Sequence, residues 1–565
     1  MDFLNIQQDC FYKVTQTSET DKLGLKHDSN WKVLIYDDVS FNIISNFKIG
    51  DLRENNITLH LHINEKKAEL GGVDAIYFLS PTSSSIDSFI ADIQQDYFEE
   101  VYLNFCGGLT KEDCEKLVNK LIETGKTTRV KQISQYSMDL FPLSKKIFTC
   151  ALENTFLCKK ESMIRKISDK LTDFCYFTGK LPVVIYDGES ERAEAIFSLL
   201  KYNFTQDSNR YLPNPEQLTN DKRMILILNT NGMDWNPFLV HSFAYFDLIV
   251  EHFGICKRIK NFNQIKVGDE VIKLDLKNDR FLQKNAFEDF PDVSSNITEE
   301  MEVWKEKYDQ ITGKTEEPND FAKKFSEALE SLPEITEHKK INQNHMNIAS
   351  NLMKTINQRE LEKICVISNY ILNYKKISRE YALEIEELFK EEKVVLSDKL
   401  RLLLMIITNT KTDITKFEHY EKVLSEHETL SESQKRLIKQ LKTEKFKPGT
   451  NNTTLLSMFT SKSKRMWDNV VSQNYHFSGS KLIYNLFKKK ESLDKLRIQQ
   501  IIPNSNQFLL SKVEDVVLFN IDGGNLSEYS ELIKLEKQLN KNIYFGFSGL
   551  LTGEDVLNKL ADETT

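Results

Sequence analysis

The sequence predicts an α/β protein in which a large helical domain is inserted between the parts of a second α/β domain. Three observations lead to this fold class. Short apolar segments alternate with helical stretches near the start, further apolar segments recur after residue 180, and a long intervening stretch lacks both of the strongest helix breakers. The 565 residues leave room for three or four domains.

The first 150 residues predict a parallel sheet. Its strand candidates are short and apolar on both faces, which is typical of strands covered on both sides by helices. Helical stretches at 85–95 and 111–123 separate them, and repeated βα units favour a doubly wound domain. The strands are expected at 31–37, 57–63, 75–79 and 101–105.

A second set of apolar segments predicts a second sheet that is discontinuous in sequence. Candidates at 182–186 and 224–228 precede the helical region, and candidates at 516–520 and 542–546 follow it. Two strands at the end of a chain cannot form a stable sheet alone, so they are expected to complete the earlier one. The helical region is then an insertion between the two parts of the second α/β domain.

The helical region is predicted from its lack of the helix-breaking residues glycine and proline. From Glu334 to Lys447 there is no glycine or proline in 114 residues, while Leu, Glu, Lys and Ile abound. We therefore expect almost continuous helix, with turns made by Asn, Ser, Thr and Asp.

Composition excludes several classes of protein. A net charge of −9 disfavours a generic nucleic-acid binder, which needs a basic face. The longest apolar run in the helical half, Leu402–Ile407, is far shorter than the roughly 18 residues that span a bilayer, and the first residues do not resemble a signal peptide. Eight cysteines include no C-x-x-C pair, so we expect a reducing, cytoplasmic compartment and neither a bound metal nor a cofactor.

Two short motifs are candidate chemical sites. Gly125-Lys126-Thr127 resembles the end of a phosphate-binding loop, but Lys120 stands where that loop needs its first glycine, and a turn leaving a helix is the favoured interpretation. The alternative of another class is a nucleotide-binding α/β enzyme. His60 and His62 share one face of a strand, but no third metal ligand is near in sequence, so two polar side chains at a strand end are favoured.

Two helical stripes of apolar residues remain, and core packing is the default interpretation of both. A long helical hairpin that projects from the body could instead present such a stripe to partner helices. The first stripe is Cys114, Leu117, Val118 and Leu121, and the second is Ile341, His345, Ile348, Leu352 and Ile356.

Several segments, in their order along the chain, resemble the SM (Sec and Munc) family of SNARE-binding proteins, and within it the Sly-type branch. No single motif is decisive, but the order and spacing are specific and cover nearly the whole chain. The segments are 31–37 with 57–61, Asp234 with 241–243, 332–334 with 345–349, and 523–529.

This resemblance implies a non-enzymatic arch of two doubly wound parallel-sheet α/β domains and a large, mostly helical inserted domain. Domain 1 is expected at residues 1–150, and domain 2 at 151–265 together with 496–565. Domain 3, at 266–495, is expected to carry a projecting helical hairpin at about 300–370.

The resemblance also implies two binding sites. A pocket for the N-terminal peptide of a syntaxin is assigned to Cys114, Leu117, Val118, Leu121 and Val130, with Ile122 directed towards the sheet. Leu117→Lys is then expected to abolish peptide binding with little loss of stability.

The second implied site is a helix beginning at Pro333 that would hold two SNARE segments side by side. Its expected contacts are Ile341, His345, Met346 and Leu352. Because His345 and Met346 are adjacent, they cannot both lie on one narrow stripe with Ile341, and at least one should be exposed.

The implied partners are a syntaxin-type SNARE, bound by its N-terminal peptide and its helical bundle, and an R-SNARE from the opposing membrane, with tethering factors as further candidates. The implied function is to template and proofread SNARE assembly in transport between endoplasmic reticulum and Golgi. We expect a monomer that binds no nucleic acid and reaches those membranes through bound SNAREs. The alternative within the family is a vacuolar-branch subunit of a tethering complex.

Overall fold

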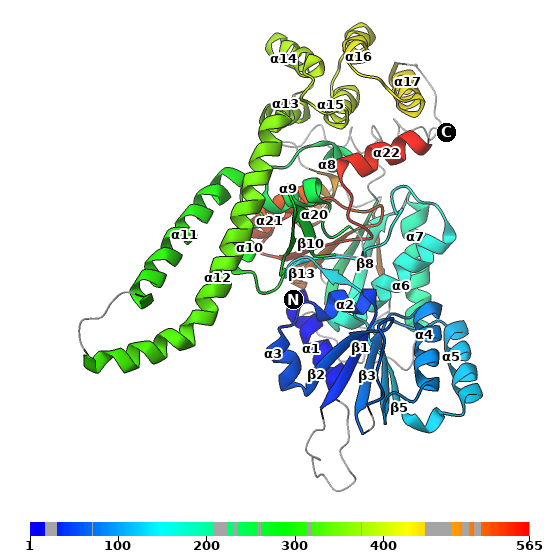
Figure 1. The fold of residues 1–565 in the computed structure, drawn as a ribbon. Helices are drawn as coiled ribbons and strands as arrows, with labels where there is room; N and C mark the ends of the chain where they lie inside the picture. The colour runs from blue at the N-terminus through cyan, green and yellow to red at the C-terminus, as the bar shows by residue number, and fades with distance from the viewer. Residues whose placement is uncertain are drawn as a thin grey trace.

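A computed structural model shows two α/β regions, a layer of helices above them and a long helical hairpin that projects to one side (Figure 1). The described residues are 1–16, 31–70, 72–206, 223–230, 234–257, 259, 262–312, 318–374, 376–446, 477–488, 496–501 and 510–563. Within these ranges no helix is long and apolar enough to cross a membrane.

The first sheet has five parallel strands in the order β2-β1-β3-β4-β5. Both of its faces are buried, because Val33 and Ile35 of β1 enter one core while Leu34 and Tyr36 enter another. This explains the continuous apolar strands and confirms the four that were predicted. The strands are β1 (Lys32–Tyr36), β2 (Ile57–His62), β3 (Asp74–Leu79), β4 (Val101–Phe105) and β5 (Val130–Gln135).

Helices cover the two faces of this sheet. Phe3 and Phe11 of α1 pack in one core, and Phe89 of α4 and Leu117 of α5 pack in the other. The helices at 85–95 and 111–123 are confirmed as α4 and α5. The elements are α1 (Phe3–Thr15), α2 (Asp38–Ile44), α3 (Ile49–Glu54), α4 (Ser83–Gln94), α5 (Lys111–Thr124) and the short η1 (Thr127–Arg129).

The second sheet has seven strands in the order β12-β8-β9-β13-β14-β7-β6. The late strand β13 lies between β9 and β14 and is parallel to both, which confirms that the end of the chain completes the earlier sheet. The two outermost strands, β12 and β6, run antiparallel to their neighbours. The strands are β6 (Phe141–Pro142), β7 (Ile147–Thr149), β8 (Leu181–Asp187), β9 (Arg223–Asn229), β12 (Leu496–Gln500), β13 (Asp515–Asn520) and β14 (Asn542–Phe547).

Strands β6 and β7 lie within the range expected for domain 1 but belong to the second sheet. The expected boundary at residue 150 therefore assigns β6 and β7 to domain 1, although both strands pair within the second sheet. The helices around this sheet are α6 (Glu161–Thr178), α7 (Glu191–Gln206), α8 (Asn236–Leu239), α9 (Tyr245–Phe253), α20 (Ser478–Lys488), α21 (Ser527–Leu539) and α22 (Gly553–Glu563), and η6 (Leu510–Lys512) precedes β13.

The stretch without glycine or proline is helical, as predicted, from the second half of α12 to the end of α17. A two-stranded antiparallel hairpin and the helices α10 and α11 precede it. The elements are β10 (Gln264–Val267), β11 (Glu270–Lys273), α10 (Arg280–Asn285), α11 (Phe290–Thr312), α12 (Pro318–Gln358), α13 (Leu361–Asn373), α14 (Arg379–Lys390), α15 (Leu396–Asn409), α16 (Ile414–His427) and α17 (Glu432–Phe446).

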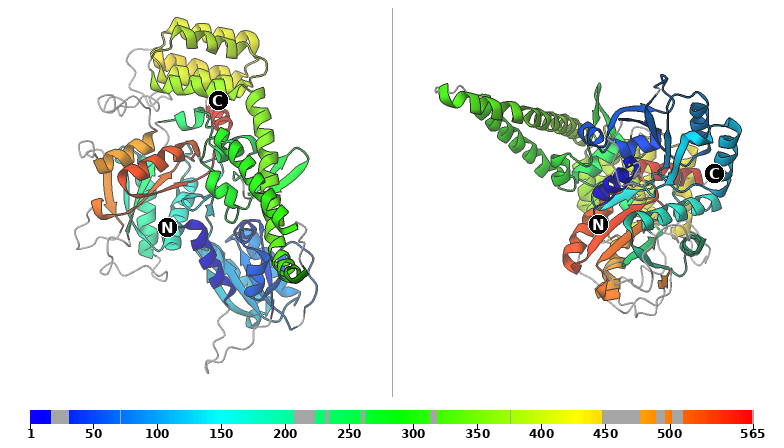
Figure 2. Two further views of the ribbon diagram at one scale, coloured as in Figure 1. Left: turned by 90° about the vertical axis from the view of Figure 1, so that its left-hand side faces the viewer. Right: turned by 90° about the horizontal axis from the view of Figure 1, so that it is seen from below.

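The hairpin of α11 and α12 projects from the body in Figure 1 and in the right-hand view of Figure 2. Pro333 does not begin this helix, contrary to expectation. Pro318 does, at a position where the missing N–H costs nothing. An interior proline removes one backbone hydrogen bond and bends a helix, and α12 curves in its N-terminal part (Figure 1).

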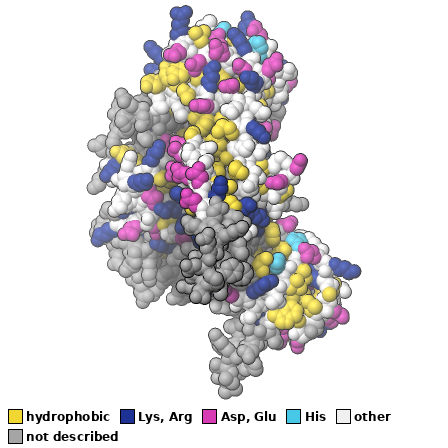
Figure 3. Space-filling view, turned by 60° about the vertical axis from the view of Figure 1, so that its left-hand side comes forward, with side chains coloured by type: hydrophobic (Ala, Val, Ile, Leu, Met, Phe, Trp, Pro, Cys, Tyr) yellow, Lys and Arg dark blue, Asp and Glu magenta, His cyan; other side chains and the backbone are white. Residues whose placement is uncertain are grey.

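The upper helical layer carries both signs of charge. Lys and Arg alternate with Asp and Glu over the face seen in Figure 3, and neither sign forms a continuous field there. Several of these charges form exposed pairs, such as Lys422 with Glu426 at 3.7 Å and Lys435 with Glu432 at 2.8 Å. Exposed pairs of this kind contribute little to stability and serve chiefly to keep a surface hydrated.

Candidate functional site

Helix α5 is held on the first sheet by its two ends and one flank. The Thr110 side chain accepts a hydrogen bond from the Asp113 N–H at the start, and Gly125 ends the helix in the left-handed conformation at φ 66°. On the flank facing α4, Lys116 and Lys120 reach the Asp87 carboxylate at 2.9 and 2.5 Å. These contacts fix the rotation of α5 about its axis.

That rotation decides which apolar residues are buried. Leu117 and Leu121 point into the sheet and are 2% and 5% exposed. Val118 and Ile122 follow them by one position each, so they lie on the flank away from Lys116 and α4, and they are 50% and 63% exposed. The assignment of Leu117 and Leu121 to a binding pocket is therefore corrected, because both are core residues. The expectation that Ile122 faces the sheet is wrong.

Strand β5 continues the exposed apolar strip. It is an edge strand, and Ile133 pairs in register with Leu103, whose side chain is buried on the α5 side of the sheet. Neighbouring residues of a parallel pair point to the same face, so Ile133 also lies on the α5 side, where it is 44% exposed. Val130 pairs with Val101 and is partly buried against the same core.

We call this strip the α5–β5 surface. Its ends are polar: Gln135 accepts a hydrogen bond from the Leu109 N–H at 3.0 Å, and Arg129 lies 3.3 Å from Asp96. The arrangement offers apolar contacts between two polar ends on a rigid sheet edge, which suits a short peptide with apolar anchors. The surface consists of Cys114, Val118, Ile122, Val130 and Ile133.

Three of these five residues were assigned to the pocket from the sequence, and Ile122 and Ile133 were not. Ile122 was missed because helical spacing does not by itself say which flank of a helix faces the sheet. Ile133 was not assigned because β5 has only two apolar residues among six and was not predicted as a strand. The segment Val130-Lys131-Gln132-Ile133 has no period-2 alternation, so the sequence offered no clear signal for this edge strand.

The second candidate surface is on α12. His345 and Leu352 are fully buried, so they are not available as partner contacts, while Ile341 is partly buried against the core. Met346 is 39% exposed, which confirms that His345 and Met346 lie on different faces. Met353, seven residues later and so on the same face as Met346, is 41% exposed and was not among the residues assigned from the sequence. The Pro333 side chain lies outside the described residues.

His345 instead fastens α12 to the body. Its Nδ1 lies 2.8 Å from the Tyr245 hydroxyl on α9, and its Nε2 lies 2.9 Å from Asp279, which also caps α10. Burial, followed by the charge of Asp279, raises the pKa of Tyr245, so this hydroxyl remains protonated. One imidazole therefore ties three elements together at the base of the hairpin.

A second cluster holds the other end of α12. Arg359 donates two hydrogen bonds to the fully buried Asp398 on α15, at 2.7 and 3.0 Å, and His241 Nε2 lies 3.1 Å from the same carboxylate. Burial opposes the charge on Asp398, but the hydrogen bonds from His241 and Arg359 outweigh it and lower its pKa. Burial and then Arg359 lower the pKa of His252 to about 4.

The turn after α5 does not form a phosphate-binding loop. Gly125 is the left-handed residue that ends the helix, and Lys126 forms an ion pair with Asp96, which confirms the interpretation as a turn. The carboxyl end of β1 is also filled by the chain itself. The Asp37 carboxylate accepts hydrogen bonds from Ser80 N–H, Ser80 Oγ and Ser85 Oγ at 2.7, 2.6 and 2.9 Å, so these donors are already used.

We therefore expect no nucleotide binding at this turn. Titration of Mg–ATP or Mg–GTP at millimolar concentration should give no saturable heat by calorimetry, and Lys126→Ala should behave like the parent protein. Saturable heat that disappears in Lys126→Ala would contradict this expectation.

Among the described residues, no group of three or more His, Cys, Asp or Glu is placed to hold a metal ion.

Two parallel-sheet α/β regions, a discontinuous second sheet and an inserted helical region with a projecting hairpin define the SM class of fold. The chain belongs to the Sec1 family, whose model matches residues 32–559. The resemblance found in the sequence is thereby confirmed.

Curated relatives come from the Sly-type branch. The chain is 24% identical to the "SEC1 family transport protein SLY1" of Arabidopsis thaliana, over 95% of this chain and 92% of that protein. It is 26% identical to "Protein SLY1" of Saccharomyces cerevisiae, over 71% of this chain and 64% of that protein. It is 22% identical to the human "Sec1 family domain-containing protein 1", over 94% and 93%.

Solved structures share the fold along the whole chain. Sly1p in complex with an N-terminal peptide of Sed5p superposes with a TM-score of 0.77 at 19% identity, covering 100% of this chain and 99% of that one. The SM protein Vps45 in complex with the Qa SNARE Tlg2 superposes with a TM-score of 0.78 at 15% identity, covering 100% and 98%. These similarities establish the architecture.

Proposed function

We propose that this protein binds a syntaxin-type SNARE and templates SNARE assembly in transport between endoplasmic reticulum and Golgi. The observation that carries the proposal is the α5–β5 surface, where Val118, Ile122 and Ile133 are exposed on a rigid sheet edge. The relatives' names and the solved complex of Sly1p with a Sed5p peptide support it. The protein acts without catalysis, in the cytoplasm, at the surface of these membranes.

The α5–β5 surface receives the N-terminal peptide of the syntaxin in this proposal. Cys114, Val118, Ile122, Val130 and Ile133 form the contact, while Leu117 and Leu121 support it from below. The experiment is a titration of labelled N-terminal peptides from candidate syntaxins, followed by fluorescence anisotropy. Saturable binding by an ER–Golgi syntaxin peptide supports the proposal. Capture of tethering-complex subunits without any syntaxin would favour the vacuolar-branch alternative.

The hairpin aligns the helical segments of the syntaxin and of an R-SNARE. Its base is held rigidly through His345 and Arg359, and a rigid template reduces the ordering entropy that two flexible chains lose on pairing. Met346 and Met353 give an adaptable apolar contact, because methionine packs against surfaces of varied shape.

Replacing both methionines should slow templated assembly. In Met346→Lys/Met353→Lys we expect the acceleration of SNARE assembly, measured by energy transfer between labelled SNAREs, to fall by about thirtyfold, since two apolar contacts of about 1 kcal/mol each are lost. The melting temperature should stay within about 2 °C because both side chains are partly exposed.

The matched control is Val395→Lys, a similarly exposed apolar residue in the upper helical layer. It should leave assembly unchanged. Equal acceleration by the double variant and the parent protein would show that this face of α12 does not contact SNAREs.

A further inference from the structure

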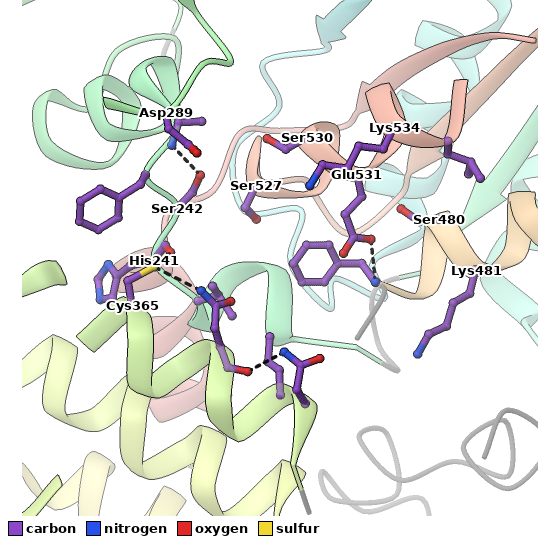
Figure 4. A pocket seen from close by; sticks show the side chains of 18 of the residues that line it. His241, Ser242, Asp289, Cys365, Ser480, Lys481, Ser527, Ser530, Glu531 and Lys534 are labelled. Atoms are coloured by element: carbon purple, nitrogen blue, oxygen red, sulfur yellow. Dashed lines mark hydrogen bonds between the residues drawn. The ribbon is translucent and has the colours of Figure 1, made fainter. Parts of the chain in front are cut away.

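The largest cavity in the described part of the chain, about 960 Å³ between α13, α20 and α21, has mixed polar and apolar walls that select no ligand (Figure 4). The antiparallel helices α13 and α14 nearby offer a more specific surface. Two contacts fix how they face each other: Lys363 pairs with Glu387 at 3.2 Å, and the rings of Tyr370 and Tyr381 stack with centroids 4.0 Å apart. Helix α14 lies at the upper margin of the molecule (Figure 1).

The α13 side of this junction presents apolar side chains to solvent. Val366 and Tyr374 share one helical stripe with Lys363 and Tyr370, and they are 51% and 58% exposed. On α14, Leu383 lies one turn before the glutamate that pairs with Lys363, and it is 55% exposed. Single exposed apolar residues need no explanation, but apolar residues gathered along one helix junction mark an interaction surface.

The α14 side of the junction is acidic. Glu387 belongs to a stripe of four glutamates with the spacing of one helix face, and the ion pair with Lys363 shows that this face is directed towards α13. Among the described residues, Glu387 alone of the four forms an ion pair. Arg379 and Lys390 lie on the far side of Leu383, away from α13. The stripe is Glu380, Glu384, Glu387 and Glu391.

Stacked tyrosine rings complete the surface at one end. The Tyr370 ring packs against Tyr381 and, at 4.7 Å, against Tyr374. The Tyr370 hydroxyl donates a hydrogen bond to the Lys376 carbonyl and accepts one from the Ser378 N–H, so the rings are held in place. The exposed Tyr374 ring is available to a partner, and the face of an aromatic ring attracts cations, most often the guanidinium group of arginine.

We propose that this α13–α14 surface binds an amphipathic, arginine-rich helix of a partner protein. The apolar face of that helix packs on Val366 and Leu383, while its arginines pair with the glutamate stripe and stack on Tyr374. The surface consists of Val366, Tyr374, Leu383 and the stripe Glu380, Glu384, Glu387 and Glu391.

Charge complementarity selects this occupant. A surface with an excess of carboxylates repels nucleic acid and anionic lipid and attracts a basic chain. The α13 stripe from Lys363 to Tyr374 covers about 16 Å of helix, so a partner helix of three to four turns matches its length. The surface is separate from the α5–β5 surface and from the methionines of α12, and the proposal does not depend on the proposed function.

The test uses the full-length protein and a labelled helical peptide of about 15 residues, with leucine on one face and arginine on the other. Fluorescence anisotropy should show saturable binding in the micromolar range. Two control peptides should each bind at least tenfold more weakly. One carries glutamate in place of arginine, and the other has the same composition with leucine and arginine mixed over both faces.

Val366→Gln/Leu383→Gln should weaken peptide binding at least tenfold without lowering the melting temperature, because both side chains are more than half exposed. The matched control Val271→Gln/Ile414→Gln changes two exposed apolar residues elsewhere and should bind like the parent protein. Light scattering of the same samples tests whether a second copy of the chain occupies the surface. Self-association of the parent protein that disappears in Val366→Gln/Leu383→Gln would overturn the proposal.

Glu380→Gln/Glu384→Gln separates docking from the general attraction between a negatively charged protein and a basic peptide. We expect this variant to weaken binding at least fivefold. The control Glu426→Gln/Glu432→Gln removes the same charge from exposed positions on α16 and α17 and should have no effect. Absence of binding, equal binding of the mixed peptide, unchanged binding in either test variant, or equal weakening by either control variant would each overturn the proposal.

Discussion

Val118→Lys and Ile122→Lys should each weaken binding of the syntaxin N-terminal peptide by at least tenfold, with the melting temperature lowered by less than about 2 °C. Both side chains are at least half exposed on the outer flank of α5, so a lysine meets water in the free protein. In the complex it would place a charge where the peptide's apolar anchors pack, and interface residues of this kind typically cost about 2 kcal/mol or more when replaced.

Leu117→Lys should behave differently from these two variants. Leu117 is 2% exposed beneath the α5–β5 surface, so the lysine would carry a charge into the core of the first α/β region. The loss of an apolar core side chain alone costs about 2–5 kcal/mol. Thermal unfolding should therefore show a clear drop, which reverses what the sequence alone led us to expect.

Peptide titration by fluorescence anisotropy and thermal unfolding of the same samples check these three variants together. Ile414→Lys is the matched control, because Ile414 is a similarly exposed apolar residue on α16. It should bind peptide like the parent protein. Undiminished binding in both Val118→Lys and Ile122→Lys would place the peptide site elsewhere.

Asp398→Asn should cause a large loss of stability for a single polar substitution. Asp398 is fully buried and neutralises Arg359, which joins the end of α12 to α15. Removing one charge of a buried pair leaves the other uncompensated and costs about 3–5 kcal/mol. Thermal unfolding at neutral pH measures this effect, and Glu426→Gln, which removes an exposed ion-pair partner, should change stability by less than about 1 kcal/mol.

Acidification should reduce the difference between Asp398→Asn and the parent protein. Because the folded structure lowers the pKa of Asp398, its charge stabilises the protein above the ordinary carboxyl range, and that contribution disappears as the pH falls through the lowered pKa. Folding lowers the pKa of His252 from 6.5 to about 4. As the pH falls through this interval, the unfolded chain binds a proton at His252 before the folded protein does. The parent protein therefore loses stability between pH 6.5 and about 4. Equal stability of Asp398→Asn and the parent at pH 7 would contradict the assigned role of the cluster.

The pattern of apolar residues along the sequence was sufficient to predict much of the architecture. Strands β1, β3, β4, β8, β9, β13 and β14 were predicted because both of their faces are buried, which requires continuous apolar runs. The edge strands β5 and β12 were missed, because polar residues interrupt their apolar runs, whereas the edge strand β2 was predicted although its middle positions are exposed. The helical stripe of α12 was correctly found but wrongly assigned to partner contacts. Spacing groups Ile341, His345 and Leu352 on one face, and only packing shows that this face is the core.

The sequence by itself determined the fold class and the insertion of the helical domain, because apolar periodicity and the absence of helix breakers act locally along the chain. The family was indicated by segments that resemble it in order and spacing. Only the tertiary structure decided which side of each amphipathic helix is free. The rotation of α5 depends on the core of the first sheet that receives Leu117 and Leu121, and the rotation of α12 depends on Tyr245, Asp279 and Asp398, all distant in sequence. Exposure is a property of the assembled layers, so surfaces that bind partners are recognised once those layers are in place.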